Sequence, residues 1–197
     1  MLEARDLECE RGGTALFRKL SFSVKGGELA RIAGPNGSGK TSLLRILCGL
    51  LAPAAGEVRW HGEPIGALKE EYSRQLLYLG HAPAVKEELT AAENLHVTCA
   101  LAEVRGDVRQ ALERFGIPGE KPVRQLSQGQ RRRAALARLV LSAQVPLWLL
   151  DEPLTALDSA AADLTKELIA NQIKRGGAIV YTTHQDAGLS DSRVVEL

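Results

Sequence analysis

Hydrophobic residues gather in short runs that alternate with longer segments of mixed polarity. Five of these runs read as β-strands, and several are apolar at nearly every position, which is typical of strands covered on both faces. The predicted strands span residues 20–24, 28–33, 76–80, 146–151 and 178–183. This pattern predicts a sheet buried on both sides.

The segments between these strands carry the end signals of helices. A helix is expected from Lys40 to Leu51, and another over about residues 159–174. Thr90 is followed three residues later by Glu, and Ser127 by Gln, which is the capping box that marks a helix start. Strands therefore occupy both ends of the chain, and helices dominate its middle.

This order favours an α/β core with an inserted helical lobe over two consecutive domains. A chain of 197 residues is long enough for a single domain with a sizeable core. We expect residues 1–197 to form that one domain, with a core lobe over 1–81 and 145–197 and a helical lobe over about 82–144.

Composition narrows the class of protein. The formal net charge is +1, so bulk charge does not favour binding to nucleic acid. Three widely separated cysteines, without the spacing of a zinc site, fit a reducing compartment. The charged N-terminus lacks an apolar signal core, and the most apolar stretch is interrupted by Arg138, Gln144 and Pro146. We expect a soluble, cytoplasmic chain whose membrane role, if any, comes through a partner.

The stretch "GPNGSGKT" at residues 34–41 fits the pattern G-x-x-x-x-G-K-[ST] between a strand and a helix. Glycines let the backbone approach a ligand, and successive N–H groups at a helix start bind phosphate. Lys40 supplies a positive charge for the β- and γ-phosphates of ATP, and the Thr41 hydroxyl is placed to bind Mg²⁺. The predicted nucleotide-binding residues are Gly34, Pro35, Asn36, Gly37, Ser38, Gly39, Lys40, Thr41 and Ser42.

After the phosphate loop, the second candidate element is an acidic pair that follows the apolar run "VPLWLL". Asp151 at this strand end can hold Mg²⁺ together with Thr41, and the adjacent Glu152 can deprotonate an attacking water. Taken alone, "LLDEP" is equally consistent with a strand that ends in a turn. The catalytic interpretation is favoured because the phosphate loop precedes it.

Five motifs in order make the resemblance specific. "LSQGQ" (126–130) lies between the phosphate loop and Asp151-Glu152, and "LTALD" (154–158) and "YTTH" (181–184) follow. This order resembles the ATP-binding-cassette (ABC) ATPases along essentially the whole chain. The resemblance implies a RecA-like P-loop core with an antiparallel β portion and an inserted α-helical signature lobe.

The same resemblance implies the roles of the remaining residues. Glu152 would be the general base and His184 the switch histidine, and Asp158 would lie in the loop that crosses a dimer interface. A head-to-tail homodimer would place one chain's signature on the γ-phosphate held by the other chain. That signature comprises Leu126, Ser127, Gln128, Gly129 and Gln130.

The chain departs from the family pattern in two places. Gln128 stands where the signature usually has glycine, and the aromatic residue that commonly stacks on adenine is missing near Arg11. Arg11 could stack through its planar guanidinium, or Phe17 could substitute for the aromatic residue. Arg131 to Arg133 are expected to form a solvated helix face.

His81, in "LLYLGHAP", stands where the family places a glutamine that contacts Mg²⁺ and the attacking water. Neutral imidazole offers one donor and one acceptor, so it can replace part of that amide. With the short C-terminus, this feature resembles the ATP-binding subunits of bacterial cytochrome c maturation systems. That resemblance implies heme transport from the cytoplasmic face of the inner membrane, integral membrane partners, and no direct binding of heme or nucleic acid.

Three alternatives remain open from the residues. ATPase subunits of amino-acid, metal or lipid transporters share these motifs, and they usually keep Gln at the position of His81. A soluble ABC ATPase of DNA repair or translation usually carries a coiled-coil insertion or a second cassette. A P-loop kinase of small molecules would need neither "LSQGQ" nor the switch histidine.

Overall fold

The computed structural model describes residues 1–183, 188–189 and 192–197. The strands are β1 Leu2–Arg11, β2 Thr14–Val24, β3 Leu29–Ala33, β4 Ala55–Trp60, β5 Glu63–Pro64, β6 Leu76–Leu79, β7 Leu147–Leu150, β8 Ala178–Thr182 and β9 Ser192–Glu196. The helices are α1 Lys40–Leu47, α2 Ile65–Leu68, α3 Glu70–Arg74, α4 Ala91–Leu101, α5 Val108–Arg114, α6 Gln128–Leu136, α7 Arg138–Leu141 and α8 Ser159–Lys174, with the 3₁₀ helix η1 Val123–Gln125.

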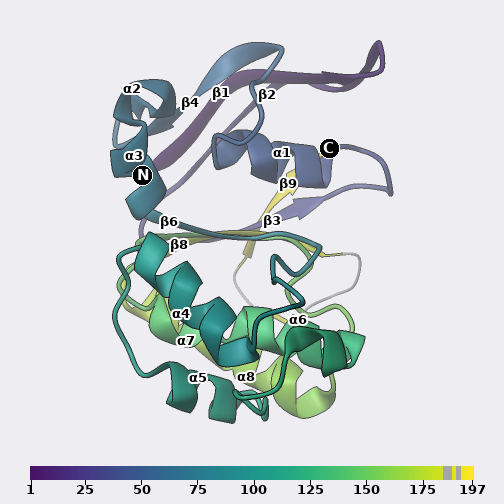
Figure 1. Ribbon diagram of the computed structural model, residues 1–197. Coiled ribbons are helices and arrows are strands. Elements are labelled where there is room, and N and C mark those ends of the chain that lie inside the picture. The colour runs from purple at the N-terminus through teal and green to yellow at the C-terminus, as the bar shows by residue number, and fades with distance from the viewer. Residues whose placement is uncertain (184–187, 190–191) are drawn as a thin grey trace.

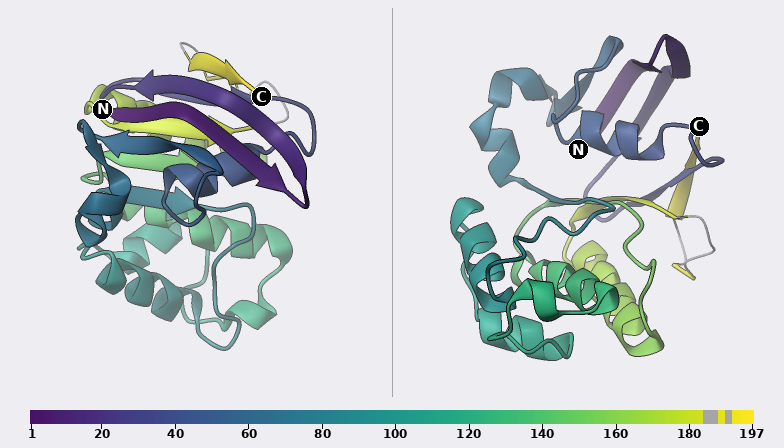
Figure 2. Two further views of the ribbon diagram at one scale, coloured as in Figure 1. Left: turned by 90° about the horizontal axis from the view of Figure 1, so that it is seen from above. Right: turned by 45° about the vertical axis from the view of Figure 1, so that its right-hand side comes forward.

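These elements form layers around two sheets (Figure 1). An antiparallel sheet with the strand order β2-β1-β4-β5 lies above helix α1, and a parallel sheet with the order β6-β7-β8-β3-β9 lies below it. Helices α4 to α8 cover the other face of the parallel sheet (Figures 1 and 2). Helix α1 is thus enclosed between two sheets, and the parallel sheet is covered on both faces.

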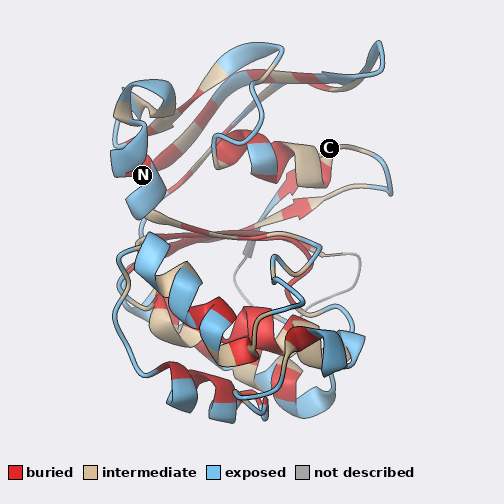
Figure 3. Ribbon diagram, viewed as in Figure 1, coloured by how far each residue is buried: buried red, intermediate tan, exposed pale blue. Residues whose placement is uncertain are grey.

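The central strand β7 explains why its sequence is apolar at every position. Leu147 and Leu149 point into the apolar cluster around α1, whereas Trp148 and Leu150 point into the cluster beneath the sheet. Successive side chains of a strand face opposite ways, so a strand with two covered faces needs no polar position. Figure 3 shows this central strand layer as buried.

The predicted strands and capping boxes are confirmed, with one error in a helix boundary. Helix α1 ends at Leu47, four residues earlier than predicted. Gly49 adopts a φ of +78°, and its N–H donates to the carbonyl of Ile46. A left-handed glycine just after the last turn is a common helix stop, because it has no Cβ to clash in that conformation.

Strands β1, β4, β5 and β9 were not predicted from the pattern. In β1, buried and exposed positions are mixed, since the antiparallel sheet is covered by α1 on only one of its faces. Gly56 allows β4 to pair with β1, because a Cβ there would lie 2.3 Å from the carbonyl oxygens of Arg5 and Asp6. The pairing depends on this close approach of two backbones.

Residues 82–144 supply α4 to α7, which lie beneath the parallel sheet (Figure 1). One apolar cluster joins these helices to the sheet and to α8, for example through Leu112, Leu136 and Trp148. The helices of residues 82–144 are thus packed against the sheet in one cluster. The division of the chain into a core lobe and a helical lobe stays a prediction. Within the described ranges, no helix is both long and apolar enough to span a bilayer.

Candidate functional site

The phosphate loop connects the end of β3 to the start of α1. Gly34 has a φ of +150°, and a Cβ there would lie 2.7 Å from the Ser38 hydroxyl oxygen. Gly39, the N-cap of α1, has a φ of +104°, and its Cβ would lie 3.2 Å from the Phe17 ring. Only glycine suits these two left-handed, crowded positions, so the loop motif follows from backbone geometry.

The Lys40 side chain packs inside this loop and bonds to its backbone. Its side chain is buried, and its ammonium donates hydrogen bonds to the carbonyl oxygens of Gly34 (2.7 Å) and Pro35 (2.9 Å). Charged phosphate oxygens would accept stronger hydrogen bonds from this ammonium than two neutral carbonyls do. The loop therefore presents a positive charge and a helix N-terminus to the same space, as an anion site requires.

Asp151 follows β7 and lies against the start of α1. The Thr41 hydroxyl donates to one Asp151 carboxylate oxygen at 2.8 Å, and the Thr182 hydroxyl donates to the other at 2.7 Å. A hydroxyl and a carboxylate oxygen thus converge beside the phosphate loop. Such a pair fits Mg²⁺, which is commonly held by one or two protein oxygens together with substrate phosphates and water.

Glu152, the next residue, is also buried and has an unusual backbone. Its φ is +54°, its N–H donates to the Thr182 hydroxyl at 2.9 Å, and the Thr155 hydroxyl donates to its carboxylate at 2.9 Å. A left-handed conformation is costly for a residue other than glycine and persists only where surrounding contacts impose it. These contacts fix the backbone of Glu152 and one oxygen of its carboxylate.

Thr182 was missed by the sequence analysis. It is fully buried at the end of β8, and its hydroxyl joins Asp151 to the backbone of Glu152. The only sequence signal was the threonine pair in "YTTH", since a buried strand end rarely needs a hydroxyl unless it has a polar neighbour.

A polar cavity of about 360 Å³ brings the predicted groups together. Its lining comprises Arg11, Leu16, Asn36, Gly37, Gly39, Lys40, Thr41, Ser42, His81, Asp151 and Glu152. Residues from four separate parts of the chain therefore share one space. Gly34, Pro35 and Ser38 complete the phosphate loop, although they are not part of this lining.

The two candidates for contact with a base are placed differently. Arg11 is exposed and lines the polar cavity. Phe17 is buried in the apolar cluster around α1, with its ring against Gly39. Its aromatic face is occupied by packing, so of the two residues only Arg11 offers a free surface at the cavity.

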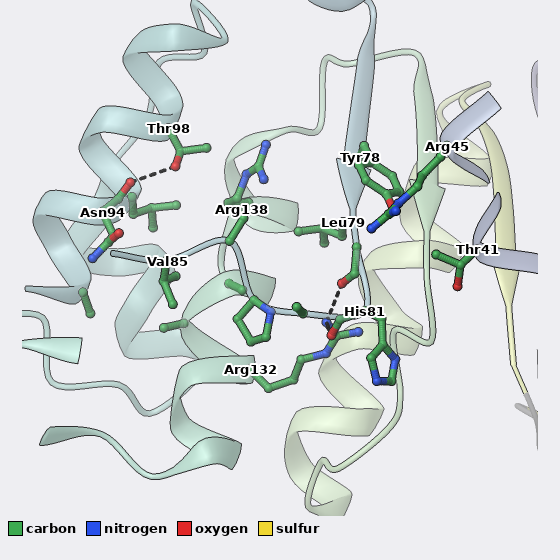
Figure 4. Close-up of a pocket in the computed structure, with 18 of the residues that line it drawn as sticks. Thr41, Arg45, Tyr78, Leu79, His81, Val85, Asn94, Thr98, Arg132 and Arg138 are labelled. Carbon is green, nitrogen blue, oxygen red and sulfur yellow. Dashed lines mark hydrogen bonds between the residues drawn. The ribbon is translucent and has the colours of Figure 1, made fainter. Parts of the chain in front are cut away.

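His81 lies at the meeting point of several cavities. Besides the polar cavity, it lines a larger one of about 550 Å³, beside Tyr78, Arg45 and Arg138 (Figure 4). A small third cavity, about 100 Å³, contains His81, Gln128 and Thr155. The imidazole is exposed and thus open to contact from all three spaces.

The signature residues form the start of α6. Leu126 is buried, whereas Ser127 and Gln128 are exposed, and Gly129 and Gln130 are half-buried. The Ser127 hydroxyl accepts a hydrogen bond from the Gln130 N–H at 3.2 Å, and the Gln130 side chain accepts one from the Ser127 N–H at 2.9 Å. The capping box leaves the hydroxyl proton of Ser127 free to donate, but the signature does not line the chain's own polar cavity.

Asp158 caps helix α8. One of its carboxylate oxygens accepts from the Ala161 N–H at 2.8 Å, and the other lies 3.4 Å from the Arg133 guanidinium. A half-exposed contact ties it to the helix that carries the signature. His184, the predicted switch histidine, lies outside the described residues.

The prediction of a solvated arginine face was wrong for Arg132. Its side chain is only 6% exposed. Its guanidinium donates to the carbonyls of Gly80 (2.8 Å) and His81 (3.1 Å), and also to those of Asp151 (2.9 Å) and Glu152 (2.7 Å). Tertiary contacts, which local polarity does not reveal, decide where this side chain lies.

Comparison with known proteins places the chain among ATP-binding cassettes. The family model described as ABC transporter matches residues 17–155. A solved structure of an ATP-binding subunit of an ABC transporter has a TM-score of 0.89 at 25% identity, covering 100% of this chain and 85% of that one. A dimeric ATP-binding cassette bound to ADP and Pi has a TM-score of 0.85 at 25% identity, covering 100% and 94%.

Curated bacterial relatives resemble the chain over nearly its whole length. Three of them carry the name cytochrome c biogenesis ATP-binding export protein CcmA. The protein from Nitrosomonas europaea is 51% identical, covering 100% of this chain and 94% of its own. The one from Aromatoleum aromaticum is 55% identical, covering 95% and 90%. The one from Escherichia coli K12 is 46% identical, covering 98% and 94%.

Proposed function

The chain belongs to the ABC transporter family and is an ATPase of that family, and on this premise we propose that it powers the heme-handling complex of cytochrome c biogenesis. In this proposal, ATP closes two copies of the chain around two shared sites, and hydrolysis reopens them. The polar cavity carries the chemical part of the proposal, because it unites the phosphate loop, Asp151, Glu152 and His81. The relatives named above support the biological part.

Binding of ATP is assigned to residues 34–42. The N–H groups of the loop and of the α1 N-terminus would surround the phosphates, and Lys40 would exchange its two carbonyl partners for phosphate oxygens. Thr41 and Asp151 would hold Mg²⁺, which supplies charge neutralisation for the phosphates when bound. Arg11 is our candidate for the contact with adenine, through stacking of its guanidinium.

Hydrolysis is assigned to Glu152 as general base. The carboxylate accepts a proton from water while the water oxygen bonds to the γ-phosphorus. The bond between that phosphorus and the bridging oxygen breaks, and the electron pair leaves with ADP. Thr182 and Thr155 hold the base in place. We assign the sensing of this water to His81 and to the switch histidine His184.

A second copy of the chain completes the proposed site. In one chain, the signature at residues 126–130 does not line the polar cavity that contains the phosphate loop. A head-to-tail pair would bring Ser127 and the N-terminus of α6 of one copy to the γ-phosphate on the other. Asp158 would lie in the contact between the copies.

The proposed location is the cytoplasmic face of the bacterial inner membrane. The chain would attach there through integral membrane subunits of the cytochrome c maturation system. We assign transport of heme to those subunits and no heme-binding role to this chain.

Isolation of the tagged chain from detergent-solubilised membranes of its own bacterium tests the assignment. We expect subunits of the cytochrome c maturation system to co-purify, and the untagged chain serves as the control for background. Recovery of amino-acid permease subunits without any maturation protein would refute the assignment to cytochrome c biogenesis while leaving the ATPase assignment intact.

A further inference from the structure

Arg132 links the signature helix to both strand ends that carry the catalytic groups. One guanidinium nitrogen donates to the carbonyls of Gly80 and His81, just after β6, and the other donates to those of Asp151 and Glu152, just after β7. Figure 4 shows the side chain of Arg132 extending to the backbone beside His81. A single side chain thus contacts the backbone of three residues of the polar cavity.

The register of the sheet makes this contact possible. Strands β6 and β7 run parallel with Leu79 opposite Leu150, and the Asp151 N–H donates to the Leu79 carbonyl at 2.7 Å. The residues that follow the two strands therefore leave the sheet side by side. A planar guanidinium has donors pointing in fixed directions, so it can serve two neighbouring pairs of carbonyls at once.

Burying the charged guanidinium of Arg132 costs free energy of desolvation, which its hydrogen bonds must offset. Burial lowers the pKa of Arg132, and the nearby charges of Asp151 and Glu152 act in the opposite direction. Among the described residues, its four hydrogen-bond acceptors are neutral backbone carbonyls, although the carboxylates of Asp151 and Glu152 lie close enough to act on its charge. A buried cation that bonds to carbonyls fixes the backbone on which those carboxylates stand.

We propose that Arg132 is a positioning residue that sets Glu152 and His81 relative to the signature helix. When α6 engages a phosphate on the second copy, the guanidinium transmits the position of the helix to both strand ends. The position of the base thus depends on the position of that helix. This inference rests on the proposed role of Glu152 as general base.

Steady-state kinetics of Arg132→Gln in the isolated membrane complex test the inference. We expect kcat for ATP hydrolysis to fall about 100-fold, because small misplacements of a reacting group cost about that much. KM, and the Kd for a fluorescent ATP analogue, should stay within about 3-fold of wild type, because the phosphate loop is untouched. Arg109→Gln, an exposed arginine on α5, is the matched control and should leave all three values unchanged.

Two further variants separate positioning from folding. Arg132→Lys keeps the charge but donates from one point, so we expect a stable chain with a similarly reduced kcat. Placed in a Glu152→Gln background, Arg132→Gln should lower the residual single-turnover rate by less than about 3-fold, because its effect acts through that base.

Three outcomes would overturn the inference. The first is a wild-type kcat in Arg132→Gln or Arg132→Lys beside an inactive Glu152→Gln, which leaves the base assignment standing. The second is a rise in KM and Kd in step with a lower Tm, which reduces Arg132 to a structural role. The third is a wild-type kcat in Glu152→Gln itself, which removes the base assignment together with the inference.

Discussion

At the scale of single residues, the site is built from side chains whose partners are backbone groups. Thr182 bonds to the N–H of Glu152, Arg132 bonds to carbonyls at two strand ends, and Lys40 bonds to carbonyls of its own loop. Fixing the backbone fixes the direction in which each carboxylate points. In the proposed site, the placement of Asp151 and Glu152 therefore depends on Thr182 and Arg132, to which we assign no contact with the water or the phosphate.

We expect substitution of His81 to separate ATP hydrolysis from coupling to the membrane partner. His81→Gln should retain substantial ATPase activity, because a carboxamide has the donor and the acceptor that neutral imidazole offers. His81→Ala should lose coupling to the membrane partner, because His81 lies where the polar cavity meets the larger one. The measurements are ATPase rate and heme delivery in cells. If His81→Ala left heme delivery intact, His81 would have only a structural role.

At the scale of elements, helices α4 and α6 begin with the same capping motif, but we propose a role in ATP binding only for the start of α6. Thr90 caps α4 and Ser127 caps α6, each in a reciprocal capping box. Hydrogen bonding to Thr90 holds the pKa of Glu93 below its ordinary value. Only the cap at Ser127 belongs to a predicted signature, so the two helix starts form a natural comparison.

Alanine at each cap tests that difference. Thr90→Ala and Ser127→Ala should each lower the free energy of unfolding by about 1 kcal/mol, the usual cost of losing an N-cap. Only Ser127→Ala should also slow ATP hydrolysis, by about 10-fold or more, because it removes a donor to a charged phosphate. Chemical unfolding and ATPase assays measure the two effects. Equal ATPase rates in both variants would contradict a phosphate contact at Ser127.

At the scale of the whole molecule, one chain supplies an incomplete site. The phosphate loop, Asp151 and Glu152 share a cavity that the signature does not line. One apolar cluster joins the helices below the parallel sheet to that sheet, so the signature and the catalytic strand ends belong to one packed unit. In the proposed function, another copy supplies the rest of each site.

Trapping of nucleotide tests the paired arrangement. Glu152→Gln should slow hydrolysis about 100- to 10,000-fold, the usual range for loss of a general base, and should keep ATP bound in a closed dimer. The readout is ATP retained by the isolated complex after free nucleotide is removed, together with its oligomeric state. Adding Ser127→Ala should release that ATP. A chain that stays monomeric in saturating ATP beside its membrane partners would contradict the proposal.

Several features followed from local pattern because their causes are local. The phosphate loop needs glycines at left-handed positions, and the caps of α4 and α6 need a hydroxyl three residues before a matching side chain. The central strand β7 of the parallel sheet is apolar throughout because both of its faces are covered. Each of these requirements is met within a few consecutive residues and is therefore readable from sequence.

The sequence by itself thus determined the family, the phosphate loop and the acidic pair that follows β7. The tertiary structure alone decided that β1 pairs with β4, that Thr182 joins the two carboxylate residues, and that Arg132 is buried rather than solvated. Those contacts join residues about twenty to sixty positions apart, for which no local periodicity exists. An arginine or a threonine reads as a surface residue until the fold supplies its partners.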